Sequence, residues 1–325
     1  MKRTLSPLSL LIAAALAVPA ASTIAAQTYP ERPVRLVVPF GAGGSYDPVA
    51  RVIAVYVGES MKQQIIVDNR GGASGIIGAD IIARATPDGY TVGLLGNNHT
   101  ITQALRSDAP YDVLKDFNLI SRLGVVDNAV VVHPSLPAKT LKDFIALARA
   151  NPGKYNFGSG GATGTTHFGG ELFNSLAETK IVHVPYKGGG LAVVGLVGGE
   201  VQMMVLNMIN ADPHMKAGRL RGLAMAAKTR HPLQPDLPTT AEAGLPGMEM
   251  SQWYGFVVPN GVPKTVFARW QSELKRMVEL PEAKQRLASQ GVTAMYETPQ
   301  QFHAYLKQDI ETMRKLAKQA NIRAE

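Results

Sequence analysis

Short apolar runs alternate along the chain with segments whose apolar residues recur every three or four positions. The first such pair is the run at 34–40 and, after a glycine cluster, the residues from Val49 to Val57. A run that is apolar throughout is typical of a buried strand, and a spacing of three and four is typical of a helix. The pattern therefore predicts a strand followed by a helix, which Asp47 is expected to cap.

The same alternation repeats toward the C-terminus. It predicts strands at 34–40, 64–67, 90–95, 155–158, 181–185, 201–206, 220–226 and 292–296. It predicts helices from 47 onward and at 74–85, 140–150, 164–177, 188–198, 263–279, 281–290 and 299–320. Ile77, Ile81 and Ile82 are expected to share one side of the helix at 74–85.

Alternating strands and helices predict an α/β fold with mostly parallel sheets and helices on both faces. The number of strands suggests two such sheets, and the segments 119–132 and 250–259 are the candidate crossings between them. With two crossings, residues 27–127 and 254–325 form one discontinuous domain, and residues 128–253 form an inserted second domain. Ligands of open α/β sheets bind beyond the carboxyl ends of the strands, so a cleft between the domains is expected.

Composition narrows the class of protein. Of the 325 residues, 46% are hydrophobic and 18% are charged, which excludes a disordered chain. Cysteine is absent, which excludes disulfides, thiolate metal sites and a cysteine nucleophile. The net charge is +8, but Lys and Arg are scattered without a run of five, so we expect no nucleic-acid partner.

Residues 1–26 have the three parts of a secretory signal peptide. Lys2 and Arg3 form a positive start, 8–18 are an apolar stretch too short to span a membrane, and small residues follow. Cleavage is expected after Ala25 or Ala26, and the alternative is an uncleaved anchor. No later stretch is a credible span, so we expect a soluble protein exported to the periplasm.

Glycine-rich turns follow predicted strands and open predicted helices. The first is 40–47 and the second is 158–167, in separate α/β units. Backbone N–H groups in such turns, together with the partial positive charge of a helix N-terminus, favour an anion. The two turns suggest two jaws that grip one small anionic ligand, and the alternative is a pair of structural turns. Their candidate ligand-binding residues are Phe40, Ala42, Gly43, Gly44, Ser45, Asp47, Ser159, Thr163, Gly164, Thr165, Thr166 and His167.

Two further turns would lie at the same sheet end as the first. They are 69–75, with candidates Ala73 and Ser74, and 96–100, with candidate Asn98. An Asn side chain both donates and accepts hydrogen bonds, which suits a carboxylate or an amide. A purely structural turn is the alternative for each.

The sequence lacks the common motifs of catalysis. Gly-x-Ser-x-Gly, His-Glu-x-x-His and the P-loop do not occur, and the seven His residues lack metal-ligand spacing. The glycine spacing also fails to match a dinucleotide site. We therefore expect no enzyme, no cofactor and no metal, with an exported α/β enzyme as the less favoured alternative.

Five ordered motifs resemble those of one protein family. They lie at 39–51, 67–78, 87–91, 183–190 and 238–244, and the match covers essentially the whole chain after the signal peptide. They are similar to motifs of the substrate-binding proteins of tripartite tricarboxylate transporters, also called Bug receptors. The resemblance implies a type II periplasmic binding fold, in which two α/β domains close over a ligand like a hinged trap.

The resemblance also implies a ligand and partners. The turns at 40–47 and 159–167 would hold a ligand carboxylate, largely through backbone N–H groups and waters. The ligand would be a small organic acid, and the partner a membrane permease with one large and one small integral subunit. A sensor kinase is the alternative partner. The receptor itself is expected to be a monomer.

One departure from the family pattern bears on the choice of ligand. Where the family usually has an Asp, apolar residues and then Phe-Asp, this chain has Gln202 and, near the strand end, Leu206 followed by Asn207. A carboxylate at Leu206 could hold a ligand amino group, so its loss predicts a receptor that does not select α-amino acids. A neutral, solvent-facing replacement at Gln202 is equally open. Tyr186, Leu206 and Asn207 complete the candidate site, although Tyr186 could equally belong to the core.

Overall fold

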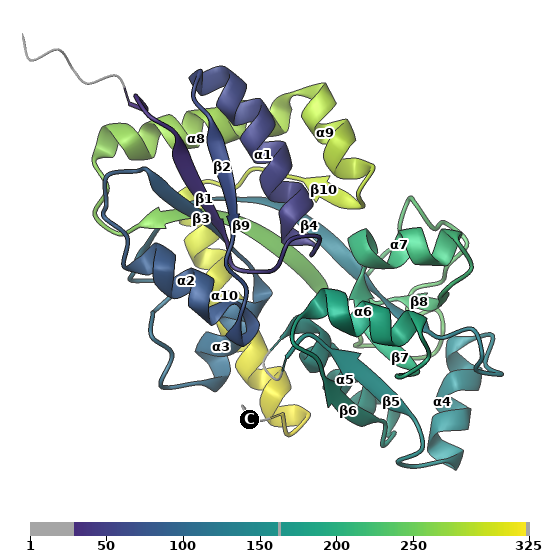
Figure 1. Cartoon of the computed structure of the whole chain (residues 1–325). Helices are drawn as coiled ribbons and strands as arrows, with labels where there is room; N and C mark the ends of the chain where they lie inside the picture. Colours follow the sequence, from purple (N-terminus) through teal and green to yellow (C-terminus); the bar gives the residue numbers. More distant parts are fainter. Residues whose placement is uncertain (1–28, 162–163, 323–325) are drawn as a thin grey trace, which may run out of the picture.

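The computed structural model of the protein describes residues 29–161 and 164–322. The predicted signal peptide, 1–26, and the candidate residue Thr163 lie outside the described residues. The described chain forms two α/β lobes that lie side by side and are joined by long strands (Figure 1). The first lobe combines the purple and blue start of the chain with its yellow-green end, and the second lobe is built from the teal and green middle (Figure 1).

The strands of the described residues form one connected set. They pair in the order β2-β1-β3-β9-β4-β7-β5-β6, and β8 and β10 both pair with β4. Each predicted strand is present. The bounds are β1 Val34–Val38, β2 Ile65–Asn69, β3 Thr91–Leu95, β4 Phe117–Val132, β5 Asn156–Ser159, β6 Val182–Pro185, β7 Met203–Asn207, β8 Arg221–Met225, β9 Ser251–Pro259 and β10 Val292–Ala294.

The helices include each predicted one and two more, α3 and α7. The bounds are α1 Tyr46–Met61, α2 Ile76–Ala83, α3 Asn97–Leu105, α4 Leu141–Ala150, α5 Thr165–Ala177, α6 Gly189–Val197, α7 Met208–Lys216, α8 Lys264–Glu279, α9 Pro281–Ala288 and α10 Pro299–Gln319, with a 3-10 turn η1 at Ala73–Gly75. The apolar pattern misses α3 because its buried face is largely polar, and it misses α7 because Pro213 interrupts the segment.

The long strands β4 and β9 carry the chain between the lobes. Residues 117–127 of β4 pair with β9, and residues 128–132 of β4 pair with β7 and β8. The hydrogen-bonding partner of β4 therefore changes between Asp127 and Asn128. The domain limits given above remain a prediction.

The expectation of mostly parallel sheets is wrong. β1 is parallel to β2 and β3, and β5 is parallel to β6 and β7. β4 and β9, however, are antiparallel to every described strand with which they pair. These strands carry the chain between the lobes, and their direction depends on where they join each sheet. Strand–helix alternation along the sequence does not contain that information.

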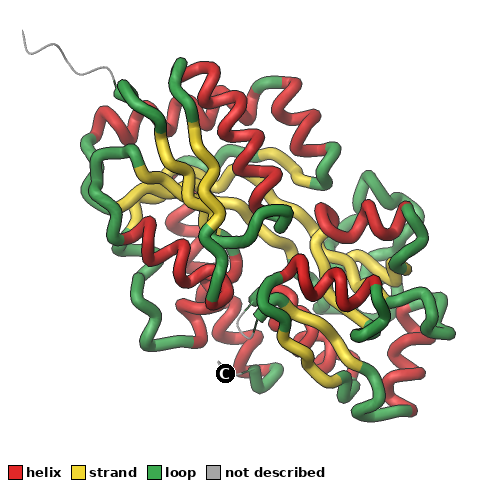
Figure 2. Tube along the Cα trace, viewed as in Figure 1, coloured by secondary structure: helices red, strands yellow, loops and turns green. Residues whose placement is uncertain are grey.

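Helices cover both faces of the first lobe's sheet (Figure 2). α1, α8 and α9 pack on one face around Trp270, and α2 and α10 pack on the other around Trp253. In the second lobe, α4 and α5 enclose a core that contains Phe144 and Phe157. Each of these aromatic side chains is at most 1% exposed, and burial of a side chain such as Phe contributes about 1.5–3 kcal/mol. The two lobes thus have substantial cores on either side of the crossing strands.

Two local expectations about helices are wrong. Asp47 does not cap α1, because the helix begins at Tyr46 with Ser45 at the N-cap position. Ile77 is 49% exposed whereas Ile82 is fully buried, because residues five positions apart on an α-helix lie about 140° apart around its axis. The first error concerns where a helix begins, and the second concerns which positions share one helix face. Among the described residues, no helix has the length and apolar content that a membrane crossing requires.

Candidate ligand-binding site

A cavity of about 840 Å³ lies between the two lobes. Residues 40–42, 44–46 and 71–75 of the first lobe form one side, and residues 164–166 and 186–191 of the second lobe form another. The fold therefore brings glycine turns from separate α/β units to one space. The predicted site residues that line it are Phe40, Ala42, Gly44, Ser45, Ala73, Ser74, Asn98, Gly164, Thr165, Thr166, Tyr186, Leu206 and Asn207.

Four predicted residues, Gly43, Asp47, Ser159 and His167, do not line this cavity. The backbone N–H of Gly43 donates to the Asp47 carboxylate at 3.3 Å, and Arg51 donates to the same oxygen at 3.0 Å. Ser159 is fully buried and His167 is 5% exposed, and neither lines the cavity. Asp47 and Ser159 hydrogen-bond to the glycine turns from behind, because their side chains are drawn to backbone and side-chain partners inside their own lobes.

Behind the second turn, the Ser159 hydroxyl is hydrogen-bonded to His183, whose ring stacks on that of His167. Ser159 Oγ lies 2.6 Å from His183 Nε2, and the rings of His183 and His167 stack with their centroids 4.1 Å apart. Burial, with a smaller contribution from His167, lowers the pKa of His183 to about 4. His183 is therefore neutral near pH 7, and its ring packs against Phe157 at 5.0 Å.

Helix N-termini converge on the cavity. The N-cap residues of α1, α5, α6 and α7 all line it, and they are Ser45, Gly164, Gly188 and Asn207. Of these four, Asn207 alone uses its side chain to cap its helix. A helix N-terminus carries unpaired N–H groups and roughly half a positive charge, so this arrangement favours an anion.

The turn before α2 has backbone angles that residues with a side chain rarely adopt. Gly72, Ala73, Ser74 and Gly75 all have positive φ, at 135°, 46°, 55° and 99°. Such angles cost about 1–3 kcal/mol for each non-glycine residue, so the surroundings must hold the turn. Gly75 donates its N–H to Gly72 at 2.9 Å, and Asn98 donates its side-chain N–H to the Ser74 carbonyl at 3.3 Å. Strain of this kind on a cavity wall is typical of a binding site.

Charged side chains on the described wall are positive. Arg106 and Lys187 line the cavity, and none of the described residues of the wall is Asp or Glu. Arg106 donates to Asp108, which is not part of the wall, at 2.9 and 3.0 Å. No group of three His, Asp or Glu residues that could hold a metal ion occurs within 29–161 and 164–322. The electrostatic character of the cavity is thus suited to an anionic organic ligand.

Hydrogen bonds join the lobes across the cavity. Asn98 of α3 accepts from the backbone N–H of Thr165 at 3.2 Å and from the hydroxyl of the same residue. Gln252 of β9 donates to Ser45 at 2.9 Å and accepts from Asn207 at 3.3 Å. These bonds hold the two lobes together around the enclosed space.

Comparison with known proteins identifies the family. The family model described as tripartite tricarboxylate transporter family receptor matches residues 49–322. This chain belongs to that family. Its members are periplasmic binding proteins with two α/β domains, and they are solute receptors rather than enzymes. The Bug resemblance is therefore confirmed.

Individual relatives match over nearly the whole length. Protein BugT of Bordetella pertussis is 34% identical over 96% of this chain and 95% of its own. The structure of R. palustris Rpa4515 with adipate is 32% identical, with a TM-score of 0.88, over 91% of this chain and 99% of that one. MatC from Rhodopseudomonas palustris with bound malate is 29% identical, with a TM-score of 0.84, over 89% of this chain and 99% of that one. The similarity therefore includes both lobes.

Sequence reasoning misses several polar residues on the described wall of this receptor's cavity, among them Arg106, Lys187, Asn210 and Gln252. Arg106 directly follows α3 and Asn210 lies in α7, and neither helix was expected from the pattern. Gln252 lies in the predicted crossing 250–259, where a polar side chain within an apolar strand was the available signal.

Gln202 and Leu206, the two departures from the family pattern, have different surroundings. The side chain of Gln202 accepts from Asn156 N–H at 2.9 Å and donates to the Gly199 carbonyl at 3.0 Å. It therefore stabilises the start of β7 and is not a solvent-facing replacement. Leu206 lines the cavity and is 1% exposed, so only this departure can affect the ligand directly.

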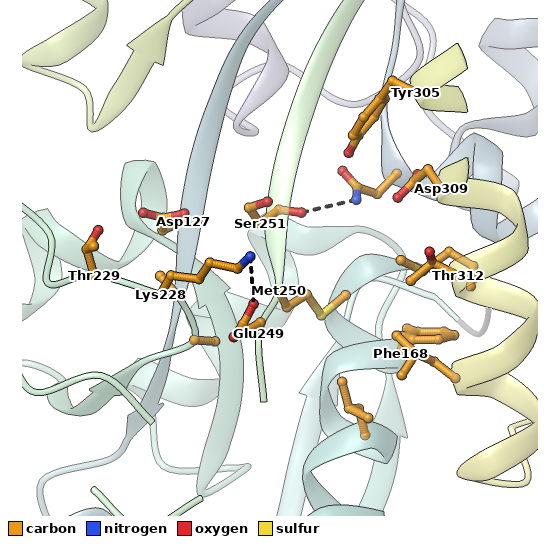
Figure 3. Close-up of a pocket in the computed structure, with 16 residues that line it drawn as sticks. Asp127, Phe168, Lys228, Thr229, Glu249, Met250, Ser251, Tyr305, Asp309 and Thr312 are labelled. Atoms are coloured by element: carbon orange, nitrogen blue, oxygen red, sulfur yellow. Dashed lines mark hydrogen bonds and ion pairs between the residues drawn. The ribbon is translucent and has the colours of Figure 1, made fainter. Parts of the chain in front are cut away.

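A second cavity, of about 560 Å³, lies on the other side of the crossing strands (Figure 3). Ser251 lines it, whereas its neighbour Gln252 lines the first cavity, because successive side chains of a strand point to opposite faces. Its wall includes Asp127, Glu249 and Asp309, and burial raises the pKa of Asp309. The candidate site residues lie outside this second cavity, whose acidic wall contrasts with that of the first.

Proposed function

We propose that this protein is a periplasmic receptor that captures a small carboxylate-bearing organic acid and delivers it to a tripartite tricarboxylate-type permease. The permease would have one large and one small membrane subunit. The observation that carries the proposal is the convergence of four helix N-termini on a cavity whose described wall has no acidic residue. Adipate and malate, which accompany two related structures, are small organic acids of this kind.

The proposed ligand contacts are the thirteen predicted residues on the wall together with Arg106, Asn210 and Gln252. A carboxylate would lie at the uncapped N-terminus of α6, where Gly188 and the residues after it offer backbone N–H groups. Several such charge-assisted hydrogen bonds in an enclosed space are enough for micromolar affinity, which corresponds to about −8 kcal/mol.

Capture is proposed to proceed by closure of the two lobes about β4 and β9. The proposed domains are 27–127 with 254–325, and 128–253. The change of partner in β4 between Asp127 and Asn128 supports these limits. The bonds from Asn98 to Thr165 across the cavity support closure, because they can form only when the lobes are in contact.

Export and oligomeric state are also part of the proposal. The protein would reach the periplasm through cleavage after Ala25 or Ala26 and act there as a monomer. The intact mass of protein from a periplasmic extract tests the cleavage site, and its size in solution tests the monomer. A mass that includes residues 1–26 would contradict the proposed export.

Mass spectrometry of small molecules released by denaturing the purified protein tests the central claim. We expect one organic acid, which then binds the refolded protein in titration calorimetry. Failure of every organic acid to bind, in this experiment and in a thermal-shift screen, would overturn the proposal. Loss of uptake of that acid on deletion of the permease genes tests delivery, and unchanged uptake would contradict it.

A further inference from the structure

A hydrogen-bonded chain of four buried side chains, here called the polar floor, lies at the base of the ligand cavity. It consists of Asn207, Gln252, Ser45 and Tyr254. Asn207 Nδ2 donates to Gln252 Oε1 at 3.3 Å, and Gln252 Nε2 donates to Ser45 Oγ at 2.9 Å and to the Tyr254 hydroxyl at 3.0 Å. None of the four is more than 7% exposed, and the first three line the cavity.

A single backbone N–H sets the direction of this chain. Asn207 Oδ1 accepts from the N–H of Asn210 at 3.2 Å, as the N-cap of α7. A backbone N–H can only donate, so Asn207 must turn its NH₂ group toward Gln252. Gln252 must then meet it with its carbonyl oxygen, and the NH₂ group of Gln252 faces the two hydroxyls.

Two hydroxyls complete the chain. Burial raises the pKa of Tyr254 far above its usual value, so Tyr254 keeps its proton, and Ser45 is the hydroxyl with which it also shares a hydrogen bond. Ser45 Oγ and the Tyr254 hydroxyl thus both accept from Gln252, and one of their two hydrogens joins them to each other. Ser45 Oγ accepts no capping bond from the N–H groups of α1. Asn207 keeps its second amide hydrogen as a donor to the cavity, and the Ser45 hydroxyl can rotate its hydrogen toward a ligand acceptor.

The surroundings of the polar floor add donors and no carboxylate. Asn128 lies opposite Asn207 in the register of β4 and β7, is 2% exposed, and its amide nitrogen has no hydrogen-bond partner. Leu206, the neighbour of Asn207, contributes an apolar side chain to the cavity wall. A ligand group with free lone pairs would satisfy the donors of Ser45 and Asn207, which line the cavity, whereas Asn128 does not line it.

We propose that the polar floor is a specificity element that binds a hydrogen-bond-accepting group of the ligand and rejects a protonated amine, with Asn207 and Gln252 as the determining residues. The proposal rests on the proposed function, because it takes the ligand to be an organic acid held by the glycine turns. A second carboxylate of the ligand would accept from Ser45 and Asn207. An ammonium group would face the same donors and find no carboxylate on the described wall to neutralise it.

Calorimetry with matched acids tests this on the full exported protein. Succinate, glutarate and adipate are each compared with the monocarboxylate of the same length (butyrate, pentanoate and hexanoate) and with the 2-amino diacid of the same length (aspartate, glutamate and 2-aminoadipate). For the diacid length that binds best, we expect about 10-fold or more tighter binding than the monocarboxylate. We expect about 100-fold or more tighter binding than the 2-amino diacid.

Two substitutions at one position test the residue assignment. Asn207→Asp keeps an N-cap oxygen for Asn210 but replaces the NH₂ group by an acceptor, so the chain through Gln252 can reverse. We expect the ratio of the affinity for the diacid to that for its 2-amino form to fall by about 30-fold or more. Asn207→Ser also keeps a capping oxygen but is neutral, and we expect it to weaken the diacid about 10-fold and the monocarboxylate less than about 3-fold.

The outcomes separate this proposal from the proposed function. Equal binding of a diacid and its monocarboxylate, or of a diacid and its 2-amino form, would overturn the role of the polar floor and leave an organic-acid receptor. Binding of no acid in the set would overturn both. If Asn207→Ser lowers the melting temperature and weakens both acids by the same factor, the side chain is structural and the proposal is wrong.

Discussion

The glycine turns at 40–47 and 158–167 look alike in sequence, yet the fold holds them differently. In the first, Asp47 bonds back to Gly43, and a Cβ atom at Gly41 or Gly43 would meet nothing within 4 Å. In the second, a Cβ atom at Gly160 would lie 2.6 Å from the backbone nitrogen of Gly189. The first turn is thus open on its outer side, and the second is packed against the start of α6. Glycine leaves the backbone of the first turn accessible, and it allows the backbone of the second turn to pack closely against α6.

The largest expected effect is on the free energy of unfolding, and it comes from adding a methyl group to the second turn but not to the first. Gly160→Ala forces backbone apart where the second turn meets α6, and we expect the free energy of unfolding to fall by about 2–3 kcal/mol. Gly41→Ala is the matched control in the open turn, with an expected change within about 0.5 kcal/mol. Urea unfolding of both variants measures this. Similar losses in the two would mean that the turns do not differ in packing.

We expect His183, which lies behind the second glycine turn, to make the stability of the fold sensitive to acid. The pKa of His183 is lowered to about 4 by burial, so the folded state binds fewer protons than the unfolded state between pH 4 and 6.5. His183 therefore destabilises the fold progressively as pH falls through this range, by about 1–2 kcal/mol after allowance for its partial exposure. His183→Gln can still bond Ser159 but does not titrate.

Unfolding free energies measured from pH 7 to pH 4 check this expectation. The loss on acidification should be smaller in His183→Gln than in the natural protein by that amount. Parallel pH profiles for the two proteins would rule out the proposed contribution of His183.

The hydrogen bonds between Asn98 and Thr165 across the cavity should contribute more to ligand binding than to the stability of the fold. Asn98→Ala removes the acceptor for Thr165 and the donor to Ser74, and we expect about 10-fold weaker binding of the released acid, or about 1.4 kcal/mol. Asn118→Ala removes an asparagine that also makes two hydrogen bonds but lies away from the cavity, on β4. Calorimetry should show an unchanged affinity for this control. Equal affinities of both variants would mean that the hydrogen bonds of Asn98 contribute nothing to capture.

The smallest effect is expected at Tyr186. It lines the cavity, but its hydroxyl donates to Glu200 at 2.9 Å and is therefore already used. Tyr186→Phe should leave the affinity for the released acid within about 2-fold, because the ring remains in place. A loss of 10-fold or more in calorimetry would show that the hydroxyl turns to the ligand, and would place Tyr186 among its polar contacts.

Much of this architecture could be predicted from the chain. The strands and most helices follow from apolar spacing, because a buried strand and an amphipathic helix need those patterns wherever they pack. The glycine turns stand at strand ends, and strand ends in α/β folds form the ligand side, so thirteen of the candidate residues could be placed on the wall in advance. The family motifs located the same segments.

Other parts of the site depend on contacts between distant segments. α3 and α7 were missed because their buried residues include Asn97, His99 and Asp212, whose burial depends on partners elsewhere in the fold. One such partner is the backbone of Ser251, to which Asn97 donates at 3.0 Å across 154 residues. A local pattern cannot show that a polar side chain will find such a partner, and so cannot distinguish these helices from exposed loops.

The sequence alone therefore determined the order of elements, the positions of the glycine turns and the family. Only the tertiary structure decided which side chains of those turns face the cavity, because that depends on what each side chain meets inside its own lobe. Asp47 and Ser159 turn away to bonds behind the wall, whereas Gln252 arrives on a crossing strand to join Ser45 and Asn207. The direction of hydrogen bonds in that floor comes from one helix cap, which exists only once α7 has formed.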